Sequence, residues 1–233
     1  MRNSSPLYLA VLVGCTVLGS LWAEFNRPRP SALEITDTGK VVTASNNPPL
    51  PPVNVFPFTP INQLEKFTHK SGIFSMNVPT GWIVNDNLEG GKLVVTWVDP
   101  NKNSVISVEI FPTPADSKKE DLIKIDKQFI EQSFDIFPGF YMEEATTQPD
   151  GSSRIVWGYT YTRRQDDQEK TARAVINRFL SQQGKYTTIV SVGFMEQYFD
   201  QVKPQLSQIV NSFNLNPSVE LSKPSPATPK SNK

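Results

Sequence analysis

Apolar and polar residues alternate along several short segments of the chain, and clusters of turn-forming residues separate these segments. The clearest cases are GIFSMNVP at 72–79 and SVISVEIF at 104–111, and a third segment, LVVTWV at 93–98, is an apolar run of strand length. A period of two, carried by β-branched and aromatic residues, is typical of β-strands. The last two segments flank DPNKN at 99–103, which has the composition of a turn. The pattern therefore predicts a run of strands joined by short turns.

The strand predicted at 104–111 has two unlike faces. One face is wholly apolar and carries Ile106, Val108 and Ile110. Glu109 lies near the middle of the other face. Because successive side chains of a strand point to opposite sides of the sheet, we expect the apolar face to pack in the core.

Further strands are expected on both sides of two more turn sequences. The segments are 140–147 and 153–163 around PDG at 149–151, and 171–181 and 185–194 around QQG at 182–184. Loops of this length join antiparallel neighbours, since parallel neighbours need long crossover connections.

Residues 117–137 change to a helical period and predict an amphipathic helix. The apolar residues at this spacing are Leu122, Ile125, Phe129, Ile130 and Phe134. Ser117 and Glu120 have the spacing of a capping box, so we expect Ser117 to be the N-cap. Pro138 and Gly139 should end the helix.

A second helical pattern near the C-terminal end predicts another amphipathic helix. Its apolar positions are Tyr198, Val202, Leu206, Ile209, Val210 and Phe213. Pro204 should kink this helix or fall in its first turn. Two blocks of hairpin-linked strands, each followed by a helix, predict an α+β domain in which helices flank an antiparallel sheet.

Residues 7–23 contain no charged side chain and are just long enough, as a helix, to span a membrane. Three interpretations remain open. The segment is an uncleaved signal anchor with Tyr8 and Trp22 at the interfaces, a signal peptide cut after Ala23, or a lipoprotein signal in which Cys15 is acylated. We expect the folded domain on the outer side of the membrane because the segment is N-terminal and signal-like.

Composition separates residues 24–233 into three parts: a proline-rich segment, the folded domain and a second proline-rich segment. Residues 24–61 are proline-rich and should form an extended linker. The folded domain is expected at 62–216, where the strand and helix patterns lie. Residues 217–233 are polar, proline-rich and basic, and should form a disordered tail.

Charge and residue counts narrow the function. The chain has 23 basic and 23 acidic residues, which gives no basic excess for nucleic acid. Cys15 is the only cysteine and lies outside the domain, so the domain has no disulfide, cysteine zinc site or thiol nucleophile. His69 is the only histidine, and any Ser-His-Asp arrangement would have to use it. We expect His69 to be a surface or capping residue.

Several carboxylates fall in predicted turns, where aspartate commonly hydrogen-bonds to nearby backbone. These residues are Asp99, Asp116, Asp150, Asp166 and Asp167. No EF-hand spacing is present, so the sequence leaves any metal site unknown. We expect no catalytic residue among them and no enzymatic activity in the chain.

Two short motifs carry a resemblance to a known family. FSMNVPTGW at 74–82 resembles the opening strand and turn of PsbP-like proteins, which belong to a wider Mog1/PsbP/DcrB group. IVNSF at 209–213 resembles the end of their last helix. Only structural residues carry over, namely Pro79, Gly81, Trp82, Ser212 and Phe213. The resemblance implies an α-β-α sandwich around an antiparallel sheet.

For PsbP relatives, the resemblance also implies an extrinsic protein on the lumenal side of photosynthetic membranes that aids photosystem II assembly or stability. The resemblance implies a bound calcium ion only as it is claimed for some members of the family. The proline-rich linker and basic tail depart from the compact photosystem subunits, so a cyanobacterial or bacterial paralogue facing the thylakoid lumen or periplasm is equally compatible.

The sequence is compatible with two functions of different classes. The first is a membrane-tethered, non-enzymatic accessory or assembly protein that binds a membrane complex through its sheet or the rim of that sheet. The second is an exported carrier of a small ligand or lipid. A carrier should have an apolar pocket between helix 117–137 and the sheet, lined by Trp97 or Trp157. Otherwise these two residues and Trp82, all in predicted strands, should pack in the core.

Overall fold

The computed structural model describes residues 57–165 and 168–221. Within these residues, eight strands form a large antiparallel sheet in the order β3-β4-β5-β10-β9-β8-β6, with β7 also paired to β8. The strands are β3 (Ile83–Glu89), β4 (Lys92–Val98), β5 (Val105–Pro112), β6 (Tyr141–Met142), β7 (Thr146–Thr147), β8 (Ser153–Gln165), β9 (Gln168–Gln183) and β10 (Tyr186–Met195). A smaller antiparallel sheet has the order β1-β2-β11 and consists of β1 (Leu64–Thr68), β2 (Phe74–Pro79) and β11 (Asn214–Leu215).

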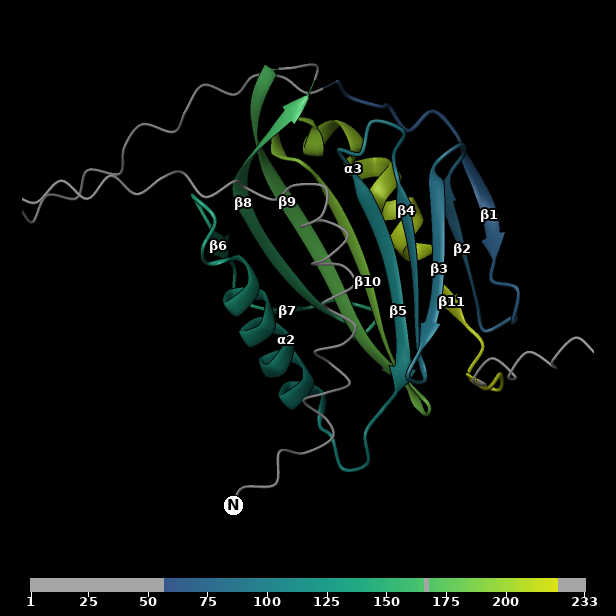
Figure 1. Ribbon diagram of the computed structural model, residues 1–233. Coiled ribbons are helices and arrows are strands. Elements are labelled where there is room, and N and C mark those ends of the chain that lie inside the picture. The colour runs from purple at the N-terminus through teal and green to yellow at the C-terminus, as the bar shows by residue number, and fades with distance from the viewer. Residues whose placement is uncertain (1–56, 166–167, 222–233) are drawn as a thin grey trace, which may run out of the picture.

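Two helices lie on opposite faces of the large sheet (Figure 1). Helix α2 (Lys119–Phe134) packs Ile130 against β8, and helix α3 (Glu196–Asn211) packs Leu206 and Ile209 into the cluster on the other face. The small sheet shares the layer of α3, because residues of β2 belong to the same cluster. The prediction of an α+β domain with helices flanking an antiparallel sheet is confirmed.

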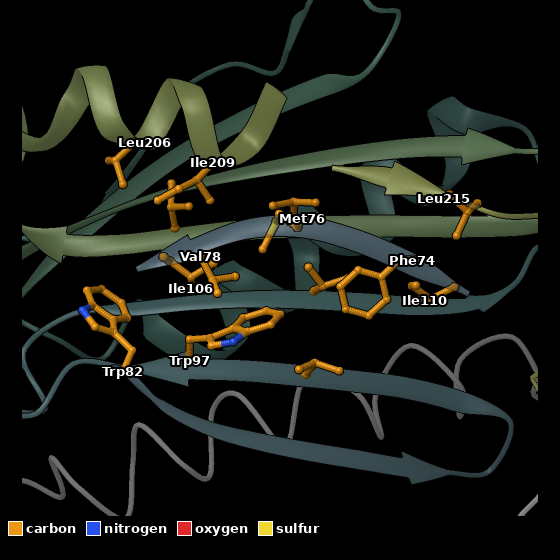
Figure 2. Packing of buried hydrophobic residues seen from close by; sticks show 14 of the residues in the cluster. Phe74, Met76, Val78, Trp82, Trp97, Ile106, Ile110, Leu206, Ile209 and Leu215 are labelled. Atoms are coloured by element: carbon orange, nitrogen blue, oxygen red, sulfur yellow. The ribbon is translucent and has the colours of Figure 1, made fainter. Parts of the chain in front are cut away.

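The main core lies between the large sheet and the layer formed by α3 and β2 (Figure 2). Alternate residues of β2 point inward, and Phe74, Met76 and Val78 are all buried. On β5, Ile106 and Ile110 are fully buried, as the apolar face of this strand predicted. Each such side chain contributes about 1.5–3 kcal/mol by leaving water.

The predicted N-cap of the first helix is wrong. Helix α2 begins at Lys119, and its N-cap is Lys118, which makes no side-chain capping hydrogen bond. Ser117 lies one residue too early, where its backbone N–H donates to the carbonyl of Pro114 at 3.2 Å. The preceding turn therefore decides where the helix begins, and the capping-box spacing does not.

The structure also decides two other details of the predicted elements. In place of one strand at 140–147, the chain forms the two-residue strands β6 and β7, which both pair with β8. Pro204 lies inside α3 rather than in its first turn. There it removes a backbone donor that would otherwise bond to the carbonyl of Asp200.

Ordered packing extends beyond residues 62–216 on both sides. Ile61 is buried in the main core, and the ring of Phe58 stacks on Tyr198 with centroids 4.4 Å apart. After the last strand, the hydroxyl of Tyr186 donates to the carbonyl of Val219 at 2.9 Å. The segments at 57–61 and 217–221 thus pack against the domain.

The predicted membrane segment at 7–23, with Cys15, lies outside the described residues. In the part of the chain that the structure describes, no helix has the length and apolar character that a membrane span requires.

Candidate functional site

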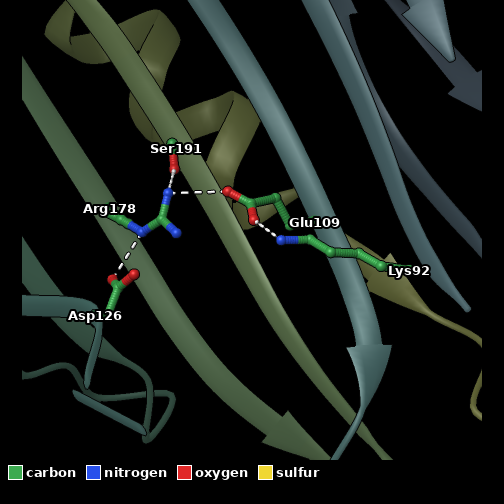
Figure 3. Close-up of polar contacts among 5 residues, drawn as sticks. All are labelled: Lys92, Glu109, Asp126, Arg178 and Ser191. Carbon is green, nitrogen blue, oxygen red and sulfur yellow. Dashed lines mark hydrogen bonds and ion pairs between the residues drawn. The ribbon is translucent and has the colours of Figure 1, made fainter. Parts of the chain in front are cut away.

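A buried network of charged side chains lies on the face of the large sheet that α2 covers (Figure 3). Arg178 of β9 donates from Nε to Asp126 Oδ2 of α2 at 2.7 Å and from Nη1 to Glu109 Oε1 of β5 at 2.9 Å. Lys92 of β4 donates to Glu109 Oε2 at 2.6 Å. The hydroxyl of Ser191 on β10 accepts from Arg178 Nη1 at 3.2 Å.

Strand register brings these side chains together. Arg178 pairs with Ser191 across β9 and β10, and Glu109 pairs with Ile189 across β5 and β10. Side chains that share a face on neighbouring strands lie within reach of long polar groups. The network therefore links four strands of the sheet, β4, β5, β9 and β10, to a helix that is distant in sequence.

Burial of the network overturns the simple two-faced interpretation of β5. Glu109 has no exposed surface, and Asp126 is 1% exposed. The apolar face of β5 is in the core as predicted, but its Glu109 face is buried as well. The sequence held one signal for this site. Asp126 lies between Leu122 and Ile130 at intervals of four residues, in the middle of the helix stripe that faces the sheet.

The two carboxylates of the network have pKa values that shift in opposite directions. Burial alone would raise the pKa of Glu109, but the charges of Arg178 and Lys92 lower it below the ordinary value. Burial raises the pKa of Asp126, and Arg178 offsets this only in part. Glu109 contacts two cations and Asp126 only one, which explains the difference. The network can hold α2 in one register on the sheet, because a shift would leave buried charges without partners.

His69 is buried, so the prediction that it lies at the surface is wrong, and the alternative of a residue that caps local backbone remains. It is 4% exposed and its ring stacks on Phe74 with centroids 5.7 Å apart. Its Nδ1 lies 2.7 Å from Ser71 Oγ, and its Nε2 lies 3.3 Å from Asp86 Oδ2. Asp86 is also 2.8 Å from Lys70 Nζ. Burial would raise the pKa of Asp86, but the hydrogen bonds from Lys70 and His69 lower it.

The order Ser71, His69, Asp86 superficially matches a hydrolase triad, but its hydrogen bonds close a turn. The backbone N–H of Ser71 also donates to His69 Nδ1 at 3.2 Å, and the N–H of Ile73 donates to Ser71 Oγ at 3.3 Å. The N–H of His69 donates to the carbonyl of Phe74 at 3.0 Å. These contacts account for the burial of the ring.

Three of the aspartates predicted to lie in turns do so. Asp99 accepts the backbone N–H groups of Asn103 and Ser104, and Asp150 accepts that of Ser152 at 2.9 Å. Asp116 adopts a positive φ of 64° between β5 and α2. Asp166 and Asp167 lie outside the described residues. Across residues 57–165 and 168–221, no three His, Cys, Asp or Glu side chains are placed to hold a metal ion.

The first motif covers the end of β2 and the turn that follows it. Pro79 ends β2, and Gly81 has a φ of +80°, which favours glycine. Trp82 is 9% exposed and lies 6.0 Å from Phe194 by ring centroids. Trp82 precedes β3, however, and is not in a strand as expected.

The second motif contacts the first. Ser212 Oγ accepts the backbone N–H of Asn77 at 2.7 Å and donates to the carbonyl of Ile209 at 2.7 Å. The ring of Phe213 lies 5.9 Å from that of Phe74. The two sequence motifs are therefore parts of a single packing unit.

The other two tryptophans lie on opposite faces of the sheet. Trp97 belongs to the main core. Trp157 packs under α2, where its ring lies 4.2 Å from Phe134 and 5.7 Å from Tyr159. Aromatic side chains thus fill the space in which the carrier alternative required a pocket, and Trp157 is 7% exposed.

Comparison with known proteins gives a likeness of fold at low identity. The sequence matches no protein-family model and no curated protein. Among solved structures, the chain is similar to cyanobacterial PsbP (CyanoP) from Synechocystis sp. PCC 6803, with 18% identity, a TM-score of 0.46, and coverage of 70% of this chain and 98% of that one. It is also similar to the Ran-binding protein Mog1p of Saccharomyces cerevisiae, with 12% identity, a TM-score of 0.43, and coverage of 66% and 95%.

A third similar structure is LpqN, which is involved in cell envelope biogenesis of Mycobacterium tuberculosis. It shares 12% identity with a TM-score of 0.35, over 66% of this chain and 91% of that one. Values in this range describe a similar arrangement of helices and strands. They carry no argument about activity, ligand or partner.

Proposed function

We propose that this chain is a membrane-tethered, non-enzymatic accessory protein that binds a partner protein through β3, the outer strand of its large sheet. The exposed edge at β3 is the observation that carries this proposal. β3 pairs with β4 on one side and ends the described sheet on the other. Six of its seven residues are exposed.

The exposed side chains of β3 include two adjacent apolar residues. Ile83 is 49% exposed and Val84 is 48% exposed. Neighbouring strand residues point to opposite faces, so apolar surface flanks the open edge on both sides. An open edge with apolar neighbours suits a partner that adds a strand, where main-chain hydrogen bonds give affinity and side-chain pockets give specificity.

A tether would compensate for the small size of this surface. Anchoring by residues 1–23, uncleaved or through acylated Cys15, would confine the domain to the membrane surface and raise its local concentration. The motifs at 74–82 and 209–213 make a photosystem II complex on the lumenal side the first partner to test, with a periplasmic membrane complex as the second. The proposal requires no cofactor.

Site-specific crosslinking of the full-length protein in its native membranes tests this proposal. A photoreactive residue at Asn85 or Asn87, both exposed on β3, should capture one partner protein. The matched control is the same residue at Gln128 or Gln132, which are exposed on α2. Capture at the α2 positions but not at the β3 positions would reject β3 as the binding edge.

The alternative, a carrier, receives no support from the space between α2 and the sheet, because Phe134 and Trp157 pack together there. A shallow hollow does lie beside α2, lined by residues of the helix and of the segment at 140–145, but neither Trp97 nor Trp157 lines it.

A further inference from the structure

A small cavity lies on the other side of the large sheet, between α3 and strands β8, β9 and β10. Its volume is about 210 Å³. Phe179, Phe199 and Leu206 form apolar walls, and Arg154, Asn177 and Lys203 supply polar groups. No carboxylate is among the described residues that line it. The cavity therefore combines an apolar interior with hydrogen-bond donors and two positive charges.

Asn177 is the most informative of these residues. It is 3% exposed, and its Oδ1 accepts a hydrogen bond from Arg154 Nε at 2.7 Å. Because the Arg154 Nε–H can only donate, the facing atom of the amide must be the oxygen, which fixes the orientation of the amide. The Nδ2 group of Asn177 then has no hydrogen-bond partner among the described residues. A buried donor without a partner is costly and points to a missing acceptor.

The two cations are also available to a ligand. The bond to Asn177 occupies Nε of Arg154 and leaves the two terminal nitrogens of the guanidinium group, which suit a carboxylate or phosphate. Lys203 is exposed on α3. Within the described part of the chain, neither Arg154 nor Lys203 forms an ion pair.

We propose that this cavity binds a small organic anion, with its carboxylate or phosphate held by Arg154, Asn177 and Lys203 and its apolar part packed against Phe179, Phe199 and Leu206. The ligand should be negatively charged because two cations and the unpaired Nδ2 group of Asn177 line the cavity. No carboxylate is among the described residues that line it. Its size follows from a volume below the range of about 300–1,000 Å³ that drug-sized ligands occupy. No residue of β3 lines the site, so the inference does not rest on binding of a partner at that edge.

Titration of the ¹⁵N-labelled full-length protein with sodium benzoate tests the site, with benzamide as the neutral probe of the same shape. Benzoate should shift the NMR signals of the Asn177 side-chain amide and of Arg154 Nε–H. Benzamide should bind at least about tenfold more weakly, since it lacks the charge-assisted hydrogen bonds. Equal binding of the two probes would overturn the assignment to an anion.

Two substitutions in the cavity and one outside it complete the test. Lys203→Glu and Arg154→Gln should each weaken benzoate binding at least about tenfold. Lys66→Glu, a charge reversal at an exposed lysine of β1 that does not line the cavity, should leave it unchanged. Near-ultraviolet circular dichroism checks that each variant keeps its packing. An equal effect of Lys66→Glu and Lys203→Glu would show general charge attraction and would overturn the site.

Inorganic phosphate separates the charged group from the apolar part. Displacement of benzoate by phosphate would support recognition through the anionic group alone. Benzoate binding that phosphate does not displace would support an anion that needs its apolar part as well. If neither probe shifts the signals of Asn177 or Arg154, the proposal is wrong.

Discussion

The backbone N–H of Asn77 donates a 2.7 Å hydrogen bond to the side-chain hydroxyl of Ser212, although 135 positions separate the two residues. β11 pairs with β2 at Asn214 and Ser75, so Ser212 and Asn77 lie two positions further along the same register. The serine hydroxyl continues the ladder where α3 ends and no strand backbone is present. Through this bond the C-terminal helix is joined to the first motif.

Replacing Ser212 with alanine should lower the free energy of unfolding by about 1–2 kcal/mol, because the N–H of Asn77 loses its partner in a partly buried position. Urea denaturation of the full-length protein measures the change. Ser207→Ala is the matched control, since Ser207 is exposed on the same helix and donates only to the Lys203 carbonyl. An equal loss in both variants would mean that the contact with Asn77 contributes nothing.

Replacing Glu109 with glutamine should lower the free energy of unfolding at neutral pH by about 3–5 kcal/mol, the usual cost of breaking a buried ion pair. The substitution keeps the shape of the side chain but removes the charge that Arg178 and Lys92 contact. The exposed Glu131→Gln on α2 serves as control and should change stability by less than about 0.5 kcal/mol. A small loss of unfolding free energy in both Glu109→Gln and Glu131→Gln would indicate that solvent reaches the buried network.

The pH dependence of stability should separate the two carboxylates. The lowered pKa of Glu109 means that its contribution is present above the ordinary value of 4.5 and is lost as the pH falls through the folded-state pKa. The difference in unfolding free energy between the wild type and Glu109→Gln should therefore become smaller at acidic pH. Urea denaturation at a series of pH values measures this difference.

Asp126 should behave in the opposite way. Its raised pKa means that its contribution is complete below the ordinary value of 3.8 and is lost as the pH rises through the folded-state pKa. Asp126→Asn should consequently gain stability relative to the wild type as the pH rises. The same trend for Glu109→Gln and Asp126→Asn would contradict the assignment of opposite shifts.

Trp82→Ala should cost about 3–5 kcal/mol of unfolding free energy, as for other large aromatic side chains in a core. Trp82 packs against Phe194 beside the β2 turn and is 9% exposed. Ile136→Ala, at a residue that is 77% exposed, is the control. A loss of less than about 1 kcal/mol for Trp82→Ala would mean that the ring is solvent-accessible in solution.

The intact protein should remain in the membrane fraction after alkaline carbonate extraction, because an apolar segment at 7–23 would hold it in the bilayer. Mass spectrometry of the mature N-terminus provides the check. A soluble protein that begins at Glu24 would reject the anchor, and an acylated Cys15 at the N-terminus would replace the anchor with a lipid.

Local patterns in the sequence predicted most of the secondary structure. The period of two identified β2 and β5, and an apolar run of strand length identified β4. The helical spacing of apolar residues identified both helices, and turn residues between the strands predicted an antiparallel sheet. Such signals are readable because they depend on residues a few positions apart. The core position of Phe74, Met76 and Val78 followed from the same alternation.

Tertiary structure alone decided which polar residues are buried together. Asp126 lies 52 positions from Arg178, and Glu109 lies 69 positions from it, so only the strand register and the docking of α2 bring their charges into contact. The burial of His69 and the cavity beside α3 arise in the same way. A charged residue reads as exposed in the sequence because burial without a partner is costly, and its partner becomes visible only when distant strands pair.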